Sequence, residues 1–379
     1  MEMPDLRHIG ASIRMYREKL GLSQKALADG LLVSFQAISA WERGNSLPDL
    51  ENCMNLAVLF GISVDALLSS GGEELYVGVD GGGTKTEYVL FDRHGKVLRR
   101  LTSEGSNPND LGVERSLQVL TGCLDQLLAG RNVRMVFCGI GGSAVGDHRE
   151  VMTKRLKERY HIPVAVDTDA VNLLSCSENP AYTIAVICGT GMGVHIRKST
   201  TRWRMGGWGY LFDQAGSAYD IGRDAIRMAL AVNDNLTAPT PFTARIVREI
   251  GGNPLTQLAD IYERGRAYIA SLSKLVAEEA ELGDPDARSI MQKNAQYIAD
   301  LLRTAMQQHG HDASIVAAGG LVTNTLYRSM IEHAAGVKLI LPDLPPVYGA
   351  CIEALRLNGI GVDGNWRQTF HETYRRHVC

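Results

Sequence analysis

The stretch from Val77 to Asp92 contains the residues best suited to bind an anion. An apolar run ends at Asp80, and three consecutive glycines, Gly81–Gly83, are followed by Thr84 and Lys85. Glycines lack a Cβ, so the backbone can adopt positive φ and approach a ligand, and clustered amides with a hydroxyl and a lysine suit a phosphate. An alternating apolar run follows, which predicts a strand, a tight turn and a returning strand. On these residues alone, an ordinary glycine-rich hairpin is the alternative.

A second turn of the same kind occurs a hundred residues later. The buried strand expected at Tyr182–Cys188 leads into Gly189–Gly193, which reads Gly-Thr-Gly-Met-Gly, and a further strand is expected at Val194–Arg197. Two such turns, one in each half, are what a nucleotide cleft between duplicated lobes requires. A Rossmann motif is disfavoured because the first turn leads into a strand and does not read GxGxxG, and no P-loop motif occurs.

The elements around the first turn predict a mixed α/β half that is ribonuclease-H-like. After the hairpin, the pattern predicts a third strand at Lys96–Thr102, a helix at Val113–Leu128, a strand at Val133–Cys138, a helix at Asp147–Tyr160, a strand at Val164–Asp167 and a helix from Asp169. The second half continues with a long helical pattern at Leu255–Gln308, a strand at Ser314–Ala317 and a closing segment at Val347–Leu355, which we assign to the second lobe. The tail from residue 361 to 379 carries no clear signal.

The first seventy residues predict a separate all-helical domain. Helices are expected at Ile9–Leu20, Ser23–Leu31, Ser34–Glu42, Leu50–Phe60 and Ser63–Leu68, with N-caps at Ser23, Ser34, Asp49 and Ser63 and with Gly21, Gly44 and Gly61 after helix ends. The second and third helices have the size and turn of a helix-turn-helix. Their LSQ…LA…VS.QAIS.WERG…P pattern resembles the Cro/repressor-like DNA-binding domains of bacterial regulators.

That resemblance implies that the helix from Ser34 enters the major groove, where Gln36 and Ser39 would face base edges. Phosphate contacts are then expected from Gln24, Lys25 and Arg43. The core is expected to contain Ile13, Leu27, Ala28, Ile38, Trp41, Leu56, Ala57 and Leu67 at helical spacing. Residues 1–70 carry six basic and eight acidic residues, so non-specific affinity for DNA is expected to be modest and a dimer on paired half-sites is expected. A helical module that binds protein is the alternative.

Length and composition bound the remaining possibilities. The 379 residues imply two or three domains, and a net charge of −3 gives no general attraction to nucleic acid or membrane. The seven cysteines form no CxxC pair, and no signal peptide or long apolar run occurs, so we expect a cytoplasmic protein without a membrane span. The expected domains are residues 1–70, a linker at 71–74, a first lobe at 75–180 and a second lobe at 181–379.

Several motifs in the same order resemble the BadF/BadG/BcrA/BcrD-type ATPase family, especially its N-acetylglucosamine kinase branch, within the actin/hexokinase/Hsp70 superfamily. These motifs are DGGGTKT, Thr168-Asp169-Ala170, GTGMG, Gly206-Gly207-Trp208-Gly209, Gly216-Ser217-Ala218-Tyr219 and Ala318-Gly319-Gly320. The resemblance covers about residues 75–357. It implies a two-lobed actin-like ATPase domain that uses ATP and Mg²⁺ to phosphorylate an amino sugar.

The resemblance also implies roles for individual residues. Asp80 is the candidate to hold Mg²⁺, and Asp169 is the candidate catalytic base, with Asp167 as its rival and a purely structural N-cap as the alternative for Asp169. Nucleotide contacts are expected from Asp80, Gly81, Gly82, Gly83, Thr84, Lys85, Gly189, Thr190, Gly191, Gly319 and Gly320. Lys85 either adds charge at the phosphates or is only solvated.

The sugar is expected to contact Asn107, Asp169, Gly207 and Trp208, although Trp208 is also suited to a core. Two departures from the family pattern affect substrate identity and turnover. Where the family typically has GDEGS, this chain has Asp213-Gln214-Ala215-Gly216-Ser217, so the sugar contact falls to Gln214 unless Asp213 replaces it. Met192 stands where serine is common.

The expected function is therefore an ATP-dependent amino-sugar kinase joined to a domain that binds a DNA operator. The main alternative is a transcriptional regulator whose kinase-like domain senses a sugar or nucleotide without significant turnover, and Gln214 favours it. A third alternative is an ATPase that energises a partner. The iron–sulfur activator function of some family members is disfavoured, because no suitable cysteine pair occurs.

Overall fold

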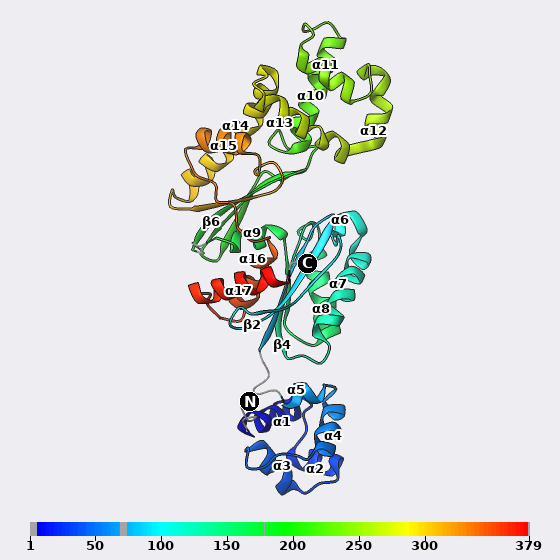
Figure 1. Ribbon diagram of the computed structural model, residues 1–379, viewed down its shortest axis with the longest axis vertical. Helices are drawn as coiled ribbons and strands as arrows, with labels where there is room; N and C mark the ends of the chain where they lie inside the picture. Colours follow the sequence, from blue (N-terminus) through cyan, green and yellow to red (C-terminus); the bar gives the residue numbers. More distant parts are fainter. Residues whose placement is uncertain (1–5, 69–73, 178, 180, 378–379) are drawn as a thin grey trace. The chain divides into compact units, whose positions relative to one another are not determined.

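The computed structural model describes residues 6–68, 74–177, 179 and 181–377 (Figure 1). Of the expected linker at 71–74, only Glu74 is among them, and Cys379 also lies outside them. The chain divides into two compact units, residues 1–172 together with 347–379, and residues 173–346.

The N-terminal helices confirm the predicted helix-turn-helix domain. They are α1 (Leu6–Lys19), α2 (Gln24–Leu31), α3 (Phe35–Glu42), α4 (Leu50–Phe60) and α5 (Val64–Leu68). The side chains of Ser23, Ser34 and Asp49 accept hydrogen bonds from backbone amides in the first turns of α2, α3 and α4, as the sequence predicts. Gly61 ends α4 in the left-handed conformation, which a glycine adopts without strain.

The core of this domain joins α1, α2, α3 and α4. All the apolar residues predicted for it are buried, including Trp41, which is 7% exposed. An ion pair stands beside this core, because Arg17 Nε donates to Glu42 Oε1 at 2.5 Å and Gln24 Nε2 donates to Glu42 Oε2 at 2.7 Å. Gln24 therefore ties α2 to the end of α3 in this structure.

The first unit also contains a twisted mixed sheet in the order β3-β2-β1-β4-β5. Its strands are β1 (Leu75–Gly81), β2 (Lys85–Asp92), β3 (Val97–Glu104), β4 (Val133–Ile140) and β5 (Val164–Asp167). The first three are antiparallel, whereas β4 and β5 run parallel to β1. The helices α7 (Val113–Leu128) and α8 (His148–Tyr160) cover one face (Figure 1), where their leucines and Met152 pack on the valines of the strands. A short helix, α6 (Pro108–Leu111), was not predicted.

The closing segment belongs to the first unit, so its assignment to the second lobe was wrong. The helices α16 (Val347–Arg356) and α17 (Gly364–Arg376) cover the other face of the β1–β5 sheet (Figure 1). Gly78 in β1 permits this packing, because a Cβ there would lie 2.6 Å from the backbone nitrogen of Cys351. The tail also carries structure that its sequence did not predict, since Trp366 and Phe370 stack and Phe91 meets both rings edge-on.

The second unit contains a sheet in the order β8-β7-β6-β9. The elements are α9 (Asp169–Ser175), which begins in the first unit, β6 (Tyr182–Cys188), β7 (Met192–Lys198), β8 (Thr201–Met205), α10 (Ala218–Asn233), α11 (Pro241–Glu249), α12 (Pro254–Ser271), α13 (Ser273–Glu281), α14 (Pro285–His309), β9 (Ser314–Ala318) and α15 (Thr325–Ala335). The predicted strand at Tyr182–Cys188 is confirmed with its bounds, and β8 was not predicted.

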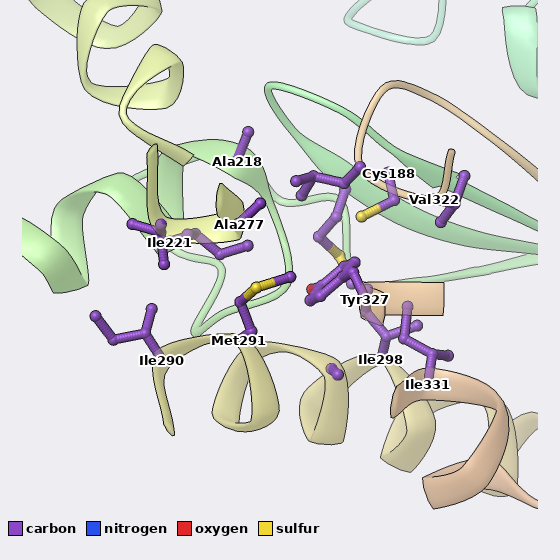
Figure 2. Packing of buried hydrophobic residues seen from close by; sticks show 14 of the residues in the cluster. Cys188, Ala218, Ile221, Ala277, Ile290, Met291, Ile298, Val322, Tyr327 and Ile331 are labelled. Carbon is purple, nitrogen blue, oxygen red and sulfur yellow. The ribbon is translucent and has the colours of Figure 1, made fainter. Parts of the chain in front are cut away.

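The core of the second unit lies between this sheet and α10, α13, α14 and α15. Figure 2 shows Tyr327 among Cys188, Met291 and Ile298. The Tyr327 hydroxyl donates to the carbonyl of Gly216 at 3.1 Å, so a buried polar group is satisfied and the loop before α10 is fixed to the core.

The single helical pattern read from Leu255 to Gln308 is divided into α12, α13 and α14. Asp284 caps α14 by accepting from two backbone amides, and Gly265 interrupts α12 with φ 67° and ψ −160°. Within the described residues, none of the helices combines the length and the apolar character needed to cross a membrane.

Candidate functional site

The turn after β1 is closed by a backbone hydrogen bond and is closely packed at Gly81. Gly82 N donates to the carbonyl of Lys85 at 3.0 Å and closes the turn. None of the three glycines has positive φ, contrary to the expectation. Instead, a Cβ on Gly81 would overlap Ser106 Oγ and lie 2.6 Å from Ile140 Cδ1. Close packing therefore requires glycine at position 81, whereas a Cβ on Gly82 would lie 3.8 Å from the Lys85 carbonyl, an ordinary contact.

Lys85 is drawn to a neighbouring carboxylate. Its Nζ lies 3.6 Å from Oε2 of the buried Glu87, while 63% of its side chain is exposed. Arg100 Nε donates to the other oxygen of Glu87 at 2.7 Å, and the Tyr374 hydroxyl donates to that same oxygen. The negative charge of Glu87 therefore offsets part of the attraction that Lys85 would exert on a phosphate at this turn.

Asp80 is held at the end of β1 by a residue that the sequence analysis missed. Asn172 Nδ2 donates to Asp80 Oδ1 at 2.6 Å and lies 3.3 Å from the carbonyl of Gly139. Burial raises the pKa of Asp80 to about 7, and the nearby charges of Asp169 and Glu87 add to this effect. Burial makes the ionised form of Asp80 unfavourable, so a nearby cation would stabilise that form strongly.

Asp169 begins α9 and faces a second glycine turn that was also missed. A Cβ on Gly141 would lie 3.2 Å from Asp169 Oδ2, and Gly141 N donates to the carbonyl of Gly81 at 2.7 Å. Gly141 therefore lies between the predicted base and the predicted phosphate turn. Burial raises the pKa of Asp169 above its usual range, although the Ala170 amide donates to the carboxylate and opposes this.

The rival base, Asp167, has a different environment. Its Oδ1 accepts from the Thr168 amide at 2.8 Å and lies 3.8 Å from Arg149 Nη1. Asp167 is thus engaged by Arg149 and by the next backbone amide, whereas Asp169 Oδ2 faces the turn at Gly141. The geometry therefore favours Asp169.

Asn107 lies at the same glycine turn as Asp169. Its side chain caps α6 by accepting from the Asn109 amide at 2.9 Å, and a Cβ on Gly142 would overlap Asn107 Oδ1. The turn at Gly141–Gly142 thus connects Asp169 with Asn107. A Gly-Ile-Gly-Gly run at the end of a predicted strand was the signal that could have identified it.

The second unit has its own pocket next to the second glycine turn. This pocket has a volume of about 630 Å³ and is lined by Gly189, Thr190 and Gly320 together with residues of α12 and α13, including Ala267, Ala270, Ser271, Lys274, Ala277, Glu278 and Glu281. Gly319 has φ 109°, and a Cβ there would overlap the Cys188 carbonyl, so only glycine fits. Gly189, Thr190 and Gly320 are thus brought together as predicted residues of one pocket.

The loop that contains Gly207 and Trp208 extends from β8. Trp208 is 58% exposed, which argues against a core role, and Arg204 Cζ lies 4.3 Å from the centroid of its ring. A Cβ on Gly193 would be 3.7 Å from the Gly207 Cα, so this loop lies beside the second glycine turn.

The residues at the two departures from the family pattern take separate positions. Asp213 is buried, and its Oδ2 accepts from the Gly209 amide at 2.9 Å, whereas Gln214 is exposed. Asp213 therefore holds the loop, and Gln214 is the exposed polar side chain. Met192 packs beneath this region, because Cβ atoms on Gly206 and Gly216 would lie 3.1 and 3.2 Å from its Sδ and Cε.

The predicted DNA-binding residues lie at or next to the helix-turn-helix pair. Lys25, Ser34, Gln36 and Arg43 are exposed, and Ser39 is partly buried. Ser34 Oγ accepts from the Ala37 amide as an N-cap, and Arg43 Nε donates to the carbonyl of Ser39 at 3.0 Å.

Phe35 was missed as a candidate for the same surface. It is the first residue of α3 and is 49% exposed. An aromatic side chain at this place suits contact with a thymine methyl group, and its position after the cap was the available signal.

Known proteins share both parts of the chain. The model of the BadF/BadG/BcrA/BcrD ATPase family matches residues 77–354, and a helix-turn-helix model matches residues 13–67. The N-acetyl-D-glucosamine kinase of Dictyostelium discoideum is 26% identical over 318 residues, which cover 75% of this chain and 98% of that protein. The HTH-type transcriptional activator BcrR of Enterococcus faecalis is 40% identical over 63 residues, which cover 17% of this chain and 30% of BcrR.

A solved structure supports the same fold. The putative N-acetylglucosamine kinase from Chromobacterium violaceum aligns with a TM-score of 0.59 at 22% identity, covering 74% of this chain and 98% of that chain. The chain thus has a helix-turn-helix DNA-binding domain fused to a domain like the N-acetylglucosamine kinases. Since the family match spans well over half of the sequence, the chain belongs to the BadF/BadG/BcrA/BcrD ATPase family.

Proposed function

We propose that the chain transfers the γ-phosphate of ATP to a hydroxyl of an amino sugar and that its helix-turn-helix domain binds a DNA operator. The observation that carries the kinase proposal is the Asp169 carboxylate, which is partly buried at the start of α9 against the turn that also contacts Asn107. A partly buried carboxylate next to a side-chain amide suits a ligand with several hydroxyl groups.

In the proposed reaction, Asp169 Oδ2 takes the proton from the sugar hydroxyl as that oxygen bonds to the γ-phosphorus. The bond from the γ-phosphorus to the bridging oxygen breaks, and ADP leaves with the electron pair. The raised pKa of Asp169 makes the ionised carboxylate a stronger base than an exposed aspartate. Asn107 orients the sugar through its amide.

The residues of the first unit fit a Mg²⁺ ion. Asp80 has a pKa of about 7 because of its burial, and the Asp169 charge lies near it, so the pair would be stabilised by a cation. In the part of the chain that the structure describes, no three His, Cys, Asp or Glu side chains gather as a metal site. This suits Mg²⁺, which commonly uses one or two carboxylates with water and substrate phosphates. When bound, the ion would neutralise charge on the phosphates.

The second unit supplies the residues proposed to bind the nucleoside and its phosphates. The 630 Å³ pocket next to Gly189 and Gly320 has the volume of a small-molecule site. Asn324 Nδ2 donates to Glu281 Oε1 at 2.7 Å, and both residues line this pocket. We propose that this set and the carboxylates of the first unit serve one reaction.

A coupled assay with ATP, Mg²⁺ and a panel of hexosamines and their N-acetyl forms tests the kinase proposal. We expect Asp169→Asn to lower turnover by about 10²–10⁴-fold, since a positioned general base contributes that much. Asp167→Asn is the matched control, because it removes a carboxylate two residues away and is expected to keep most of the activity. Full activity in Asp169→Asn would refute the assigned base.

A sugar- or nucleotide-sensing regulator is the second candidate function. The observation that favours it is the exposed amide of Gln214 next to a buried Asp213 that already holds the loop. A ligand that binds two protein states unequally shifts their populations without turnover. Gel shifts on DNA upstream of its own gene, with and without sugar and ATP, discriminate the two. Ligand-dependent binding without turnover supports the sensor, and ligand-independent binding with turnover supports the kinase alone.

We also propose that the protein acts as a cytoplasmic homodimer on DNA. Residues 1–70 have more acidic than basic side chains, so a single domain gains little from phosphate contacts. Leu50, Met54 and Val58 are 71%, 55% and 84% exposed and follow one side of α4, which offers an apolar face to a second copy. The six cysteines among the described residues are free thiols, as a reducing compartment favours.

A further inference from the structure

Helix α12 contains a break that separates two arginines. Gly265 has φ 67° and ψ −160° within the span Pro254–Ser271, and a Cβ there would meet no atom within 4 Å. The break therefore reflects backbone conformation and not crowding. Arg264 precedes the break and Arg266 follows it, so the two side chains do not share the spacing of neighbours on one regular helix.

Arg264 has partners of its own along α12. Its Nη1 lies 3.4 Å from Asp260 Oδ2, and its Cζ lies 3.3 Å from the centroid of the Tyr268 ring. It is a helix-surface arginine with a local carboxylate and a local aromatic ring.

Arg266 instead reaches the second glycine turn. A Cβ on Gly191 would lie 3.2 Å from Arg266 Nη2, and the Arg266 Cζ lies 5.6 Å from the centroid of the Tyr210 ring. Unlike Arg264, it forms no ion pair with any carboxylate among the residues that the structure describes. The guanidinium is exposed, so its donors are available to a ligand.

The position of Arg266 relates it to the pocket of the second unit. The next residue, Ala267, lines that pocket together with Ala270 and Ser271 one turn later, and Gly189 and Thr190 line it from the glycine turn. Arg266 is thus at the place where the lining of α12 meets the turn at Gly191. A nucleoside in the pocket would extend its phosphates past this guanidinium.

The glycine turn itself supplies no formal charge. No Asp, Glu, Lys or Arg occurs from Tyr182 to Ile196, so the phosphate donors of this turn are uncharged backbone amides and the Thr190 hydroxyl. A triphosphate carries several negative charges, and the planar guanidinium is well suited to bind phosphate oxygens with two donors. A cation from another element is therefore needed at this turn.

We propose that Arg266 is a phosphate-binding residue that the break at Gly265 directs to the Gly189–Gly193 turn. It binds the β- and γ-phosphates of the nucleotide whose nucleoside occupies the neighbouring pocket. The inference rests on the proposed use of ATP and adds the residue that supplies positive charge in the second unit.

Calorimetric titration of the full chain with adenosine, ADP and ATP, each with Mg²⁺, tests this role without requiring turnover. We expect Arg266→Gln to weaken ATP binding by about 10–100-fold, as expected for loss of a charge-assisted pair, and to leave adenosine binding within about twofold. Arg266→Lys keeps the positive charge but loses the pair of guanidinium donors that can bind two phosphate oxygens at once. Its ATP affinity should therefore lie between those of Arg266→Gln and the unsubstituted protein. Arg264→Gln is the matched control and should change neither.

The outcomes separate the two proposals. If the unsubstituted protein binds ATP and Arg266→Gln binds it equally well, the role of Arg266 is refuted while the proposed function stands. An equal loss for adenosine and ATP would also refute it, because it would show that the pocket has changed. If the unsubstituted protein binds no adenine nucleotide at all, the proposed use of ATP fails first, and the role of Arg266 fails with it.

A second variant tests the break itself. Gly265→Ala places a side chain where φ is positive, so the helix should straighten and redirect Arg266. We expect the same selective loss of ATP affinity with adenosine binding retained. Unchanged ATP binding would refute the part of the proposal that assigns the break a role.

Discussion

The turn at Gly81–Lys85 in the first unit and the turn at Gly189–Gly193 in the second share glycine and threonine but differ in their surroundings. The first is enclosed, since Gly81 lies against Ser106 and Ile140 and the charged Asp80 and Lys85 flank it directly. The second is open at Gly189, where a Cβ would meet no atom within 4 Å. Similar glycine patterns thus have different surroundings, namely close packing at Gly81 next to Asp80 in one unit and an open position at Gly189 beside a pocket in the other.

This difference implies a division of the proposed chemistry. The first unit carries the carboxylates that would hold the metal and remove the proton, and each of them is perturbed by burial. The second unit carries the pocket proposed for the nucleoside, and Arg266 of α12 is the cation proposed for its phosphates. The following predictions test this division, from the largest expected effect to the smallest.

Asp80→Asn should separate stability from activity in the first unit. We expect turnover to fall by about 10²–10³-fold, since a metal-holding carboxylate is lost. In metal-free buffer at pH 8 the variant should be more stable by on the order of 2–4 kcal/mol, because burial raises the pKa of Asp80 from 3.8 to about 7. Chemical denaturation gives the free energy of unfolding.

The sign of that stability change depends on pH in a defined way. The folded pKa lies above the unfolded one, so the folded state holds the proton more tightly and loses stability as the pH rises from about 4 to 7. An asparagine at position 80 does not ionise, so it does not lose this stability, and its side-chain oxygen can still accept the hydrogen bond from Asn172 Nδ2. The advantage of Asp80→Asn should therefore shrink as the pH approaches 4. A constant advantage at every pH would contradict the explanation.

Alanine at matched glycines should distinguish the enclosed turn from the open one. Gly81→Ala adds a methyl group that overlaps Ser106 Oγ, so it should destabilise the protein by about 1–3 kcal/mol. Gly189→Ala meets open space and has no positive φ to oppose it, so its effect should stay within about 0.5 kcal/mol. Thermal and urea unfolding measure both. Equal losses of unfolding free energy in the two variants would contradict the proposed difference in packing between the two turns.

The pH profile of turnover should report the burial of Asp169. Its pKa is raised mainly by desolvation, so the carboxylate becomes protonated at a higher pH than an exposed aspartate does. We expect kcat/KM for the sugar to fall about tenfold per pH unit below a midpoint that is higher than the ordinary pKa of an exposed aspartate. Asp167→Asn should leave this midpoint unchanged. A midpoint near the ordinary aspartate value would contradict a buried base.

Local signals in the sequence predict much of the first turn and of the helix-turn-helix domain. The N-caps Ser23 and Ser34 act within three residues of their own positions, and the hairpin around Gly81–Lys85 pairs neighbouring strands. Such features depend on nearby residues alone. The strand Tyr182–Cys188 was equally readable because it is continuously apolar.

The rest depends on contacts between distant residues. Asn172 reaches Asp80 across 92 positions, and nothing near either residue predicts that pair. The placement of α16 on the first sheet depends on close approach at Gly78 and Gly349. Chain order had suggested that this helix belongs to the second lobe, whereas it belongs to the first unit. The break at Gly265 was hidden because apolar residues continue on both sides of it.

Lys85→Ala provides the smallest and most discriminating comparison of the two turns. The sequence suggests Lys85 as the cation that binds phosphate. In the structure its Nζ lies 3.6 Å from Glu87 Oε2, and its side chain is largely exposed. Lys85 is largely exposed and already faces the buried Glu87, so its contact with a phosphate should contribute about 0–1 kcal/mol, and ATP affinity should fall by no more than about threefold, against the 10–100-fold loss expected for Arg266→Gln. The same calorimetric titration measures both variants. If Lys85→Ala loses as much affinity as Arg266→Gln, the first turn supplies its own phosphate cation, and the proposed division of charge between the two units is wrong.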